Sequence, residues 1–257
     1  MAPKILITGG TGYLGSKILG ICVRQGYQVA VLKRRQSNTF RIAGYLPRIK
    51  SFNTEDVSLE STIICEKYDV ILHCATEYGR RDTPVADVIS ANLLLPLRLL
   101  ELSVRAGTKV FINTDTMLDR RISHYSLSKK QFKDWLLAIP GEQARVNIAI
   151  EHFYGPGDDA TKFLSYIVNA LLEPVDRIPL TVGWQKRDFV HVDDVANAIG
   201  LVLRLAGSSC CDLRSDSSTL DFKENSASTQ HLLQPRKQIE RHIISYCFEQ
   251  FKRLLTK

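Results

Sequence analysis

The stretch FINTDTMLDRRISHYSLSKK contains side chains whose types and spacing could carry out proton transfer. Thr114, Asp115 and Thr116 are consecutive in it. About one helical turn separates Tyr125 from Lys129, so the phenol and the ammonium would share a face. A phenol has an ordinary pKa of about 10, and a neighbouring ammonium lowers that pKa. We therefore expect Tyr125 to exchange a proton with a substrate hydroxyl or carbonyl, while a threonine hydroxyl holds the reacting oxygen.

The tyrosine–lysine spacing is weak evidence by itself, because Tyr13 and Lys17 repeat it. Those two residues fall inside the helix predicted after a glycine-rich loop, where a structural role is favoured. Tyr125 instead opens the helix predicted after the strand KVFINT (109–114), and Thr114 stands at the end of that strand. Position, and not spacing, therefore selects the second tyrosine–lysine pair as catalytic, together with Thr114.

Short apolar runs that are typical of buried strands alternate with helical patterns along the first 150 residues. Such alternation implies a parallel sheet with helices on both faces. We predict an α/β fold with a doubly wound parallel sheet, the Rossmann arrangement, which binds ligands beyond the carboxyl ends of its strands. The predicted strands cover residues 4–8, 29–33, 70–74, 109–114 and 146–150, and the predicted helices begin near residues 14, 84 and 124.

The rest of the chain departs from this alternation. We predict a dinucleotide-binding domain over residues 1–150, a small substrate-binding portion interleaved with it over 151–207, and an atypical tail over 208–257. The tail begins with a serine-rich stretch, 208–231, that has no apolar period and is expected to be a loop or a poorly ordered linker. Pro235 then opens one amphipathic helix.

The glycine-rich loop GGTGYLG follows the first predicted strand and precedes the first predicted helix. Glycines at this turn let a phosphate approach the backbone, and the N–H groups and dipole of the helix attract the anion. At this position the pattern predicts a dinucleotide site. The residues expected to form it are Gly9, Thr11, Gly12, Tyr13, Leu14 and Gly15, with Cys74, Ala75 and Thr76 after a later strand.

The end of the second predicted strand distinguishes the two nicotinamide cofactors. NAD-binding sites place an acidic residue there for the ribose hydroxyls, whereas this chain has Lys33, Arg34 and Arg35. Three cations suit the additional 2′-phosphate of NADP, which a guanidinium can bind with two hydrogen bonds. We therefore expect NADP(H), and NAD is the less favoured cofactor. The alternative without a binding role is that the three cations form a solvated surface cluster.

Composition excludes several other classes of protein. The 257 residues carry a formal charge of +7, but the basic residues are scattered, which favours a small anionic ligand over a nucleic acid. No apolar run approaches the roughly 18 residues of a membrane span, and the first residues lack a signal-peptide pattern, so we expect a cytoplasmic protein. The six cysteines form no CxxC pair, and we expect neither disulfides nor a metal; His73 and His191 are expected to be packed strand residues.

Three segments, GGTGYLG, YSLSK and RDFVHVDDV (187–195), resemble the extended short-chain dehydrogenase/reductases that act on nucleotide sugars. The resemblance extends from residue 4 to about residue 205. Within that group, residues 77–101, 111–116 and 151–190 look most similar to CDP-paratose and CDP-abequose synthases. The resemblance implies a reductase that converts a CDP-linked 4-keto-3,6-dideoxyhexose to its 4-hydroxy product with NADPH, in deoxysugar or O-antigen biosynthesis.

The resemblance also implies roles for individual residues. Thr114 matches the hydroxyl residue that orients the oxygen, Tyr125 the proton donor, and Lys129 the lysine that holds the cofactor ribose and lowers the phenol pKa together with the oxidised nicotinamide. Asn92 matches an asparagine that supports the active-site helix, and we expect it among the cofactor-binding residues. The residues expected at the substrate are Tyr78, Arg80, Asp115, Thr116, His152, Lys162 and Arg187, the last of these beside the diphosphate.

The residue after Asp115 distinguishes a reductase from a dehydratase in this comparison. Similar dTDP-glucose 4,6-dehydratases have Thr-Asp-Glu at the same strand end, where two carboxylates eliminate water. This chain has Thr116 in the third position, so the second carboxylate is missing. The pattern favours ketone reduction, and Asp115 acts either on the substrate or only as a hydrogen-bonding residue.

Two alternative functions remain open at this stage. A nucleotide-sugar 4-epimerase would keep the same hydroxyl, tyrosine and lysine but hold NAD tightly. A non-catalytic NADP-binding regulatory protein would keep the glycine-rich loop and tolerate a shortened substrate lobe. The expected partner is a nucleotide-diphosphate sugar, and the leucine-rich helix at 93–104 suits either a homodimer contact or the internal core.

Overall fold

The computed structural model describes residues 2–56, 58–80, 82–172, 177–180 and 188–208. Two compact units are present among them, one formed by residues up to Glu151 together with α7 from Ala196 onward, the other by residues between His152 and Val195. Arg187 and nearly all of the predicted tail lie outside the described residues. No helix in the described ranges is long and apolar enough to cross a membrane.

The first unit is built on a six-stranded sheet whose neighbouring strands are all parallel, in the order β3-β2-β1-β4-β5-β6. Parallel strands need long crossovers, and the helices that follow each strand supply them. This sheet confirms the predicted Rossmann arrangement. Its strands are β1 (Lys4–Thr8), β2 (Gln28–Lys33), β3 (Lys50–Asn53), β4 (Val70–His73), β5 (Val110–Thr116) and β6 (Ala144–Ile150).

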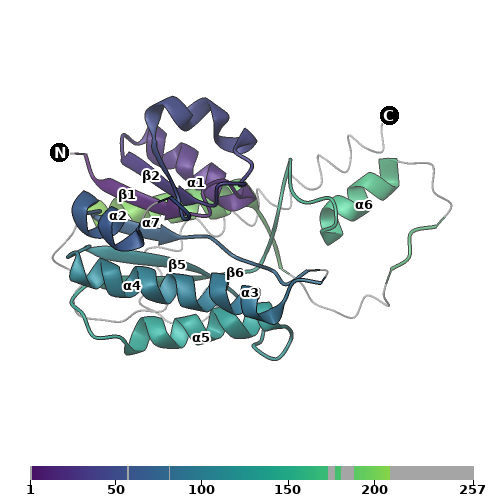
Figure 1. Ribbon diagram of the computed structural model, residues 1–257. Coiled ribbons are helices and arrows are strands. Elements are labelled where there is room, and N and C mark those ends of the chain that lie inside the picture. The colour runs from purple at the N-terminus through teal and green to yellow at the C-terminus, as the bar shows by residue number, and fades with distance from the viewer. Residues whose placement is uncertain (1, 57, 81, 173–176, 181–187, 209–257) are drawn as a thin grey trace, which may run out of the picture. The chain divides into compact units, whose positions relative to one another are not determined.

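Helices cover both faces of this sheet, as Figure 1 shows for α1 on one side and for α4 and α5 on the other. The later part of α7 contacts the turn between α1 and β2, because the Tyr27 hydroxyl donates to the Leu203 carbonyl at 3.1 Å. The helical elements of this unit are α1 (Tyr13–Arg24), the 3₁₀ helix η1 (Phe40–Arg48), α2 (Leu59–Glu66), α3 (Val85–Ile89), the π-helical η2 (Ser90–Leu94), α4 (Leu95–Arg105), α5 (His124–Ala138) and α7 (Val192–Ser208).

One cluster of the core lies between the sheet and the α4–α5 face. Leu6 and Phe111 from the strands pack in one buried cluster with Leu99 of α4 and Phe132 of α5. Apolar runs on β1, β4 and β5 are buried along their whole length or nearly so. Burial on both faces of the sheet explains why these strands are continuous apolar runs without alternation.

The predicted helix at 84–106 is interrupted by one wide turn. Residues 90–94 are π-helical between α3 and α4. Pro96 follows directly, and because proline lacks an N–H it removes the α-helical hydrogen bond to the carbonyl four residues earlier. Single π turns of this kind are frequent at functional sites, and this one contains the fully buried Asn92.

The second unit contains β7 (His152–Tyr154), β8 (Phe189–His191) and α6 (Phe163–Leu172). The two short strands pair in parallel. Aromatic rings pack across them: His191 lies edge-on to Tyr154 with ring centroids 5.5 Å apart, and His152 lies edge-on to Phe189 at 5.9 Å. His191 is therefore a packed strand residue, as predicted.

Candidate active site

The glycine-rich loop joins the carboxyl end of β1 to α1. Gly9 has a φ of +71°, and a Cβ atom on it would lie 2.5 Å from the backbone nitrogen of Ala75. Gly15 packs against the same loop, since its Cβ would lie 2.2 Å from the Gly9 carbonyl oxygen. No side chain caps the first turn of α1, whose N-cap is Gly12. The loop therefore presents bare backbone at a helix N-terminus, which suits a phosphate.

Thr114 and Tyr125 come from β5 and from the first turn of α5. The Thr114 hydroxyl donates to the His73 carbonyl of β4 at 3.1 Å. Ser123 caps α5 by accepting a hydrogen bond from the Ser126 N–H at 3.1 Å, and the Ser126 hydroxyl accepts from the Ser123 N–H. This capping box fixes where the helix begins and so where Tyr125 lies.

Lys129 lies one turn after Tyr125, as its spacing predicted, and it is 2% exposed. Its Nζ has no hydrogen-bond partner among the described residues, and burial lowers its pKa to about 8. A buried ammonium without acceptors is costly. The ribose hydroxyls of a nicotinamide cofactor would supply such acceptors, so these residues fit that cofactor.

The pKa of Tyr125 is raised above its ordinary value, chiefly because the phenol is buried and secondarily because Tyr78 is close to it. A hydrogen bond with Thr116 acts in the opposite direction without reversing the shift. The sequence-based expectation of a lowered pKa is therefore wrong for the described residues, since burial disfavours the charged phenolate. A phenol that keeps its proton is suited to donating it.

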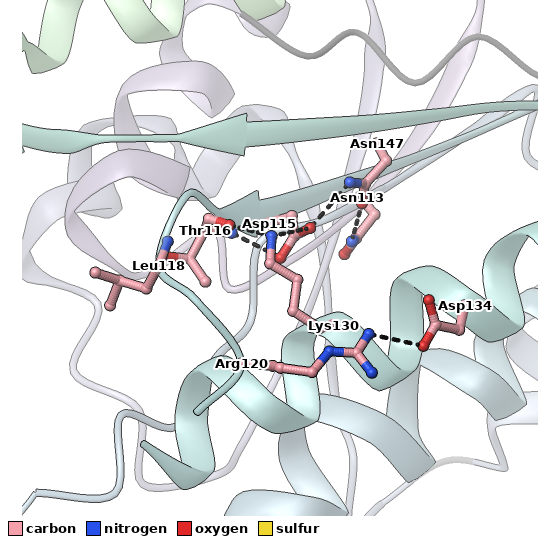
Figure 2. Close-up of polar contacts among 8 residues, drawn as sticks. All are labelled: Asn113, Asp115, Thr116, Leu118, Arg120, Lys130, Asp134 and Asn147. Carbon is pink, nitrogen blue, oxygen red and sulfur yellow. Dashed lines mark hydrogen bonds and ion pairs between the residues drawn. The ribbon is translucent and has the colours of Figure 1, made fainter. Parts of the chain in front are cut away.

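Asp115 has protein partners in place of the substrate contact expected from the sequence. Its side chain is fully shielded and forms an ion pair with Lys130 at 3.1 Å. It also accepts hydrogen bonds from the Thr116 N–H at 2.7 Å and from Asn147 Nδ2 at 3.0 Å. Figure 2 shows these partners converging on the carboxylate from β5, β6 and α5. Asp115 thus makes hydrogen bonds within the protein, and its action on a substrate stays a prediction.

Asn92, predicted among the cofactor-binding residues, hydrogen-bonds groups of the protein. Its Oδ1 accepts from the Thr76 hydroxyl at 3.1 Å and from the Glu77 N–H at 2.8 Å. Its Nδ2 donates to the Glu77 carbonyl at 2.8 Å and to the Ser128 hydroxyl of α5 at 3.1 Å. With every polar group satisfied, Asn92 holds the loop after β4 against α5, which agrees with support of the active-site helix. Ser128 was missed in the sequence because serine at a helix position has no distinctive pattern.

The predicted cations for the 2′-phosphate lie at the carboxyl end of β2. Lys33 Nζ donates to Asn53 Oδ1 at 2.6 Å, and Arg35 forms an ion pair with Asp56. Arg34 is exposed, and its side chain forms no hydrogen bond or ion pair with other described residues. Acidic residues beside the cluster were not anticipated, since they follow β3, about 20 residues further along the chain.

Tyr78 and Arg80 follow β4, as does Cys74. The Tyr78 ring lies 5.0 Å from the Tyr125 ring, centroid to centroid, and Arg80 lies 5.1 Å from the Tyr78 ring centroid. The structure therefore brings Tyr78 to the proton donor and Arg80 to Tyr78. Burial raises the pKa of the Cys74 thiol to about 12, so Cys74 is a neutral packing residue at this strand end.

Lys162 and His152, the other substrate residues predicted, belong to the second unit. Lys162 forms an ion pair with Asp158 at 2.9 Å and lies 4.3 Å from the Phe153 ring centroid. These contacts order the ammonium within its own unit. Among the described residues, no group of three or more His, Cys, Asp or Glu side chains could hold a metal ion.

Comparisons with known structures support the fold. MoeE5 in complex with UDP-glucose and NAD has a TM-score of 0.65 at 24% identity, with 81% of this chain and 73% of MoeE5 covered. UDP-glucuronic acid 4-epimerase from Bacillus cereus in complex with NAD has a TM-score of 0.68 at 19% identity, covering 78% of this chain and 74% of the epimerase. Similarity at this level of identity shows the fold alone.

Comparisons of sequence identify the family. CDP-abequose synthase of Salmonella muenchen is 33% identical over 78% of this chain and 70% of its own length. CDP-abequose synthase of Salmonella typhimurium strain LT2 is 30% identical over 77% of this chain and 69% of its own length. The NAD dependent epimerase/dehydratase family matches residues 5–210. This chain therefore belongs to the NAD dependent epimerase/dehydratase family.

Proposed function

We propose that this protein uses NADPH to reduce the C4 ketone of a nucleotide-linked 4-keto-deoxyhexose, as a CDP-abequose or CDP-paratose synthase would. The observation that carries the proposal is that Tyr125 lies one turn of α5 before a buried Lys129 with no hydrogen-bond partner among the described residues, with Thr114 at the end of β5. The sequence similarity to CDP-abequose synthases supports the choice of substrate class.

The chain's own residues account for the proton and its position. Bound NADPH would supply the hydride. The Thr114 hydroxyl would orient the carbonyl oxygen, and Tyr125, which keeps its proton because burial raises its pKa, would donate that proton as the alkoxide forms. Lys129 would hold the cofactor ribose. Asp115 is already paired with Lys130, so it would take no part as an acid.

A 4-epimerase reaction is the second candidate function. It is favoured by the acidic residues Glu55 and Asp56, which bind the backbone and the guanidinium of Arg35 and so leave fewer free cations for a 2′-phosphate. An epimerase would use NAD that returns its hydride to the same sugar.

The purified protein can be tested with NADPH and a panel of CDP-, dTDP- and GDP-linked 4-ketohexoses. We expect loss of NADPH absorbance at 340 nm with at least one of them, and a 4-hydroxy product. Interconversion of C4 epimers of a nucleotide hexose without net NADPH consumption would establish the epimerase function instead. Binding of NADPH without either reaction would favour a non-catalytic role.

The preference for NADPH can be tested at Arg34. Replacing it by Ala is expected to raise the Kd for NADPH by about tenfold and leave the Kd for NADH unchanged, since a hydrogen bond to a charged group contributes about 1.5–3 kcal/mol. Arg48→Ala is the matched control, because that arginine is also exposed but lies at the far end of η1. Both constants can be measured by nicotinamide fluorescence. Equal effects on the two cofactors would remove Arg34 from the 2′-phosphate site.

A further inference from the structure

Two lysines are adjacent at the start of α5, and only the first belongs to the tyrosine–lysine motif. Neighbouring positions on a helix face different directions, and the two side chains accordingly have different surroundings. Lys129 is buried without a partner. Lys130 is about four-fifths buried and binds both the Asp115 carboxylate, at 3.1 Å, and the Thr116 carbonyl.

The Asp115–Lys130 ion pair joins three elements of the fold. Asp115 belongs to β5 and Lys130 to α5, and Asn147 of β6 donates to the same carboxylate oxygen at 3.0 Å. Asn147 in turn accepts a hydrogen bond from Asn113 at 2.7 Å. Figure 2 shows this chain of side chains beside a second ion pair, Arg120–Asp134, which is exposed on both sides. The buried pair is the one that contacts the strand end.

The ion pair holds Thr116 by both its backbone N–H and its backbone carbonyl. Its N–H donates to Asp115, and its carbonyl accepts from Lys130. Its hydroxyl accepts from the Leu118 N–H at 3.2 Å and also hydrogen-bonds the Tyr125 phenol. The capping box sets where Tyr125 lies, and the ion pair holds Thr116, whose side chain acts on the Tyr125 phenol.

The same pair supplies the charge next to Lys129. The groups that interact with Lys129 are His73 from β4, Cys74 directly after it, Asp115 from β5 and Lys130 from α5. Burial keeps His73 neutral and raises the pKa of Cys74 to about 12, so neither is charged at neutral pH. The groups that act on the pKa of Tyr125 besides burial are Tyr78, Thr116 and Asp115. Among the described residues, Asp115 and Lys130 are the acidic and basic side chains that act on Lys129.

We propose that Lys130 is a positioning residue of this site: through its ion pair with Asp115 it locates Thr116 against Tyr125 and balances the charge beside Lys129. The effect of Lys130 on kcat rests on the proposed function, whereas its effect on the pKa of Lys129 can be measured without any substrate.

The first experiment measures the pKa of Lys129 by NMR of protein labelled with ¹³C at lysine Cε, with the signal assigned by its loss in Lys129→Met. Asp115 raises this pKa and Lys130 lowers it. We therefore expect a value above about 8 in Lys130→Met, because a nearby cation is lost, and a value below it in Asp115→Asn, because an anion is lost. Lys133→Met, three positions further along α5, is the control and should leave the value unchanged. Shifts of the same sign in both variants, or none, would overturn the proposal.

The second experiment separates positioning from charge balance. Lys130→Met alone leaves a buried carboxylate without its cation, which can prevent folding. The double variant Asp115→Asn, Lys130→Met removes both charges and should return the Lys129 pKa to near the wild-type value. It still lacks the bond to the Thr116 carbonyl, so we expect kcat for ketone reduction to fall at least tenfold while KM and the Kd for NADPH stay within about twofold.

Each result has one meaning. Wild-type kcat in the folded double variant would show that Lys130 does not position the proton donor. If the wild-type protein reduces none of the 4-ketohexoses, the proposed function fails, and the NMR titration of the single variants still decides whether the ion pair controls the charge at Lys129.

Discussion

Replacing Tyr125 by Phe is expected to lower kcat for ketone reduction by about 10²–10⁴, the usual contribution of a positioned general acid. The phenol is the group in the described site that is placed to protonate the developing alkoxide, and phenylalanine keeps its ring contact with Tyr78. The Kd for NADPH should stay within about twofold, because Lys129 and the glycine-rich loop are unchanged. Steady-state NADPH oxidation and fluorescence titration measure the two quantities.

Two companion variants make this result specific. Tyr45→Phe removes a hydroxyl whose contact is with Arg24, away from the site, and should leave kcat unchanged. Lys129→Met should weaken NADPH binding as well as lower kcat, since its ammonium is buried and has no hydrogen-bond partner among the described residues. Retention of more than about half of kcat in Tyr125→Phe would exclude the phenol as the proton donor.

Replacing Gly15 by Ala is expected to abolish tight cofactor binding and to destabilise the protein. The added Cβ would lie 2.2 Å from the Gly9 carbonyl oxygen and 2.9 Å from the Gly9 carbonyl carbon. Both atoms are backbone, so the phosphate-binding loop itself must move. Overpacking of this kind costs about 1–3 kcal/mol, which exceeds the gain of about 1 kcal/mol that alanine has over glycine inside a helix. We expect a lower Tm and at least a tenfold higher Kd for NADPH.

Gly44→Ala provides the matched control. Gly44 lies in η1, and a Cβ there would meet nothing within 4 Å. Its Tm should match or exceed that of the wild type, and its Kd for NADPH should be unchanged. A Gly15→Ala protein with wild-type Tm and Kd would mean that the loop tolerates displacement and does not set the phosphate position.

The central strands of the sheet could be predicted because burial on both faces makes them apolar throughout. β3 was missed since KSFN is short, polar and at the sheet edge, where one side lacks a neighbour and the residues are half-buried or exposed. The strand pair β7–β8 was missed for a different reason. Each strand has three residues, and about 35 residues separate them, so no local pattern signals the pairing.

In the candidate site, too, some features could be predicted from the sequence and others could not. Tyr125, Lys129 and the glycine-rich loop have fixed local spacings, and these the sequence could indicate. The partner of Lys130 could not be predicted, because the ion pair forms across a turn between β5 and α5 and a second lysine in a helix is typically solvated. The pKa of Tyr125 also depends on burial, which is a property of the folded protein and not of the motif.

The π-helical turn η2 before α4 changes the direction in which side chains point around the helix axis. Val88, Asn92 and Pro96 are all buried, at intervals of four residues. An α-helix advances about 100° per residue, so this series would drift around a regular helix by about 40° at each step. The π turn advances by a smaller angle per residue, and so it brings the three positions closer to one line. One helix can thereby keep Asn92 toward α5 while the leucines of α4 stay in the core.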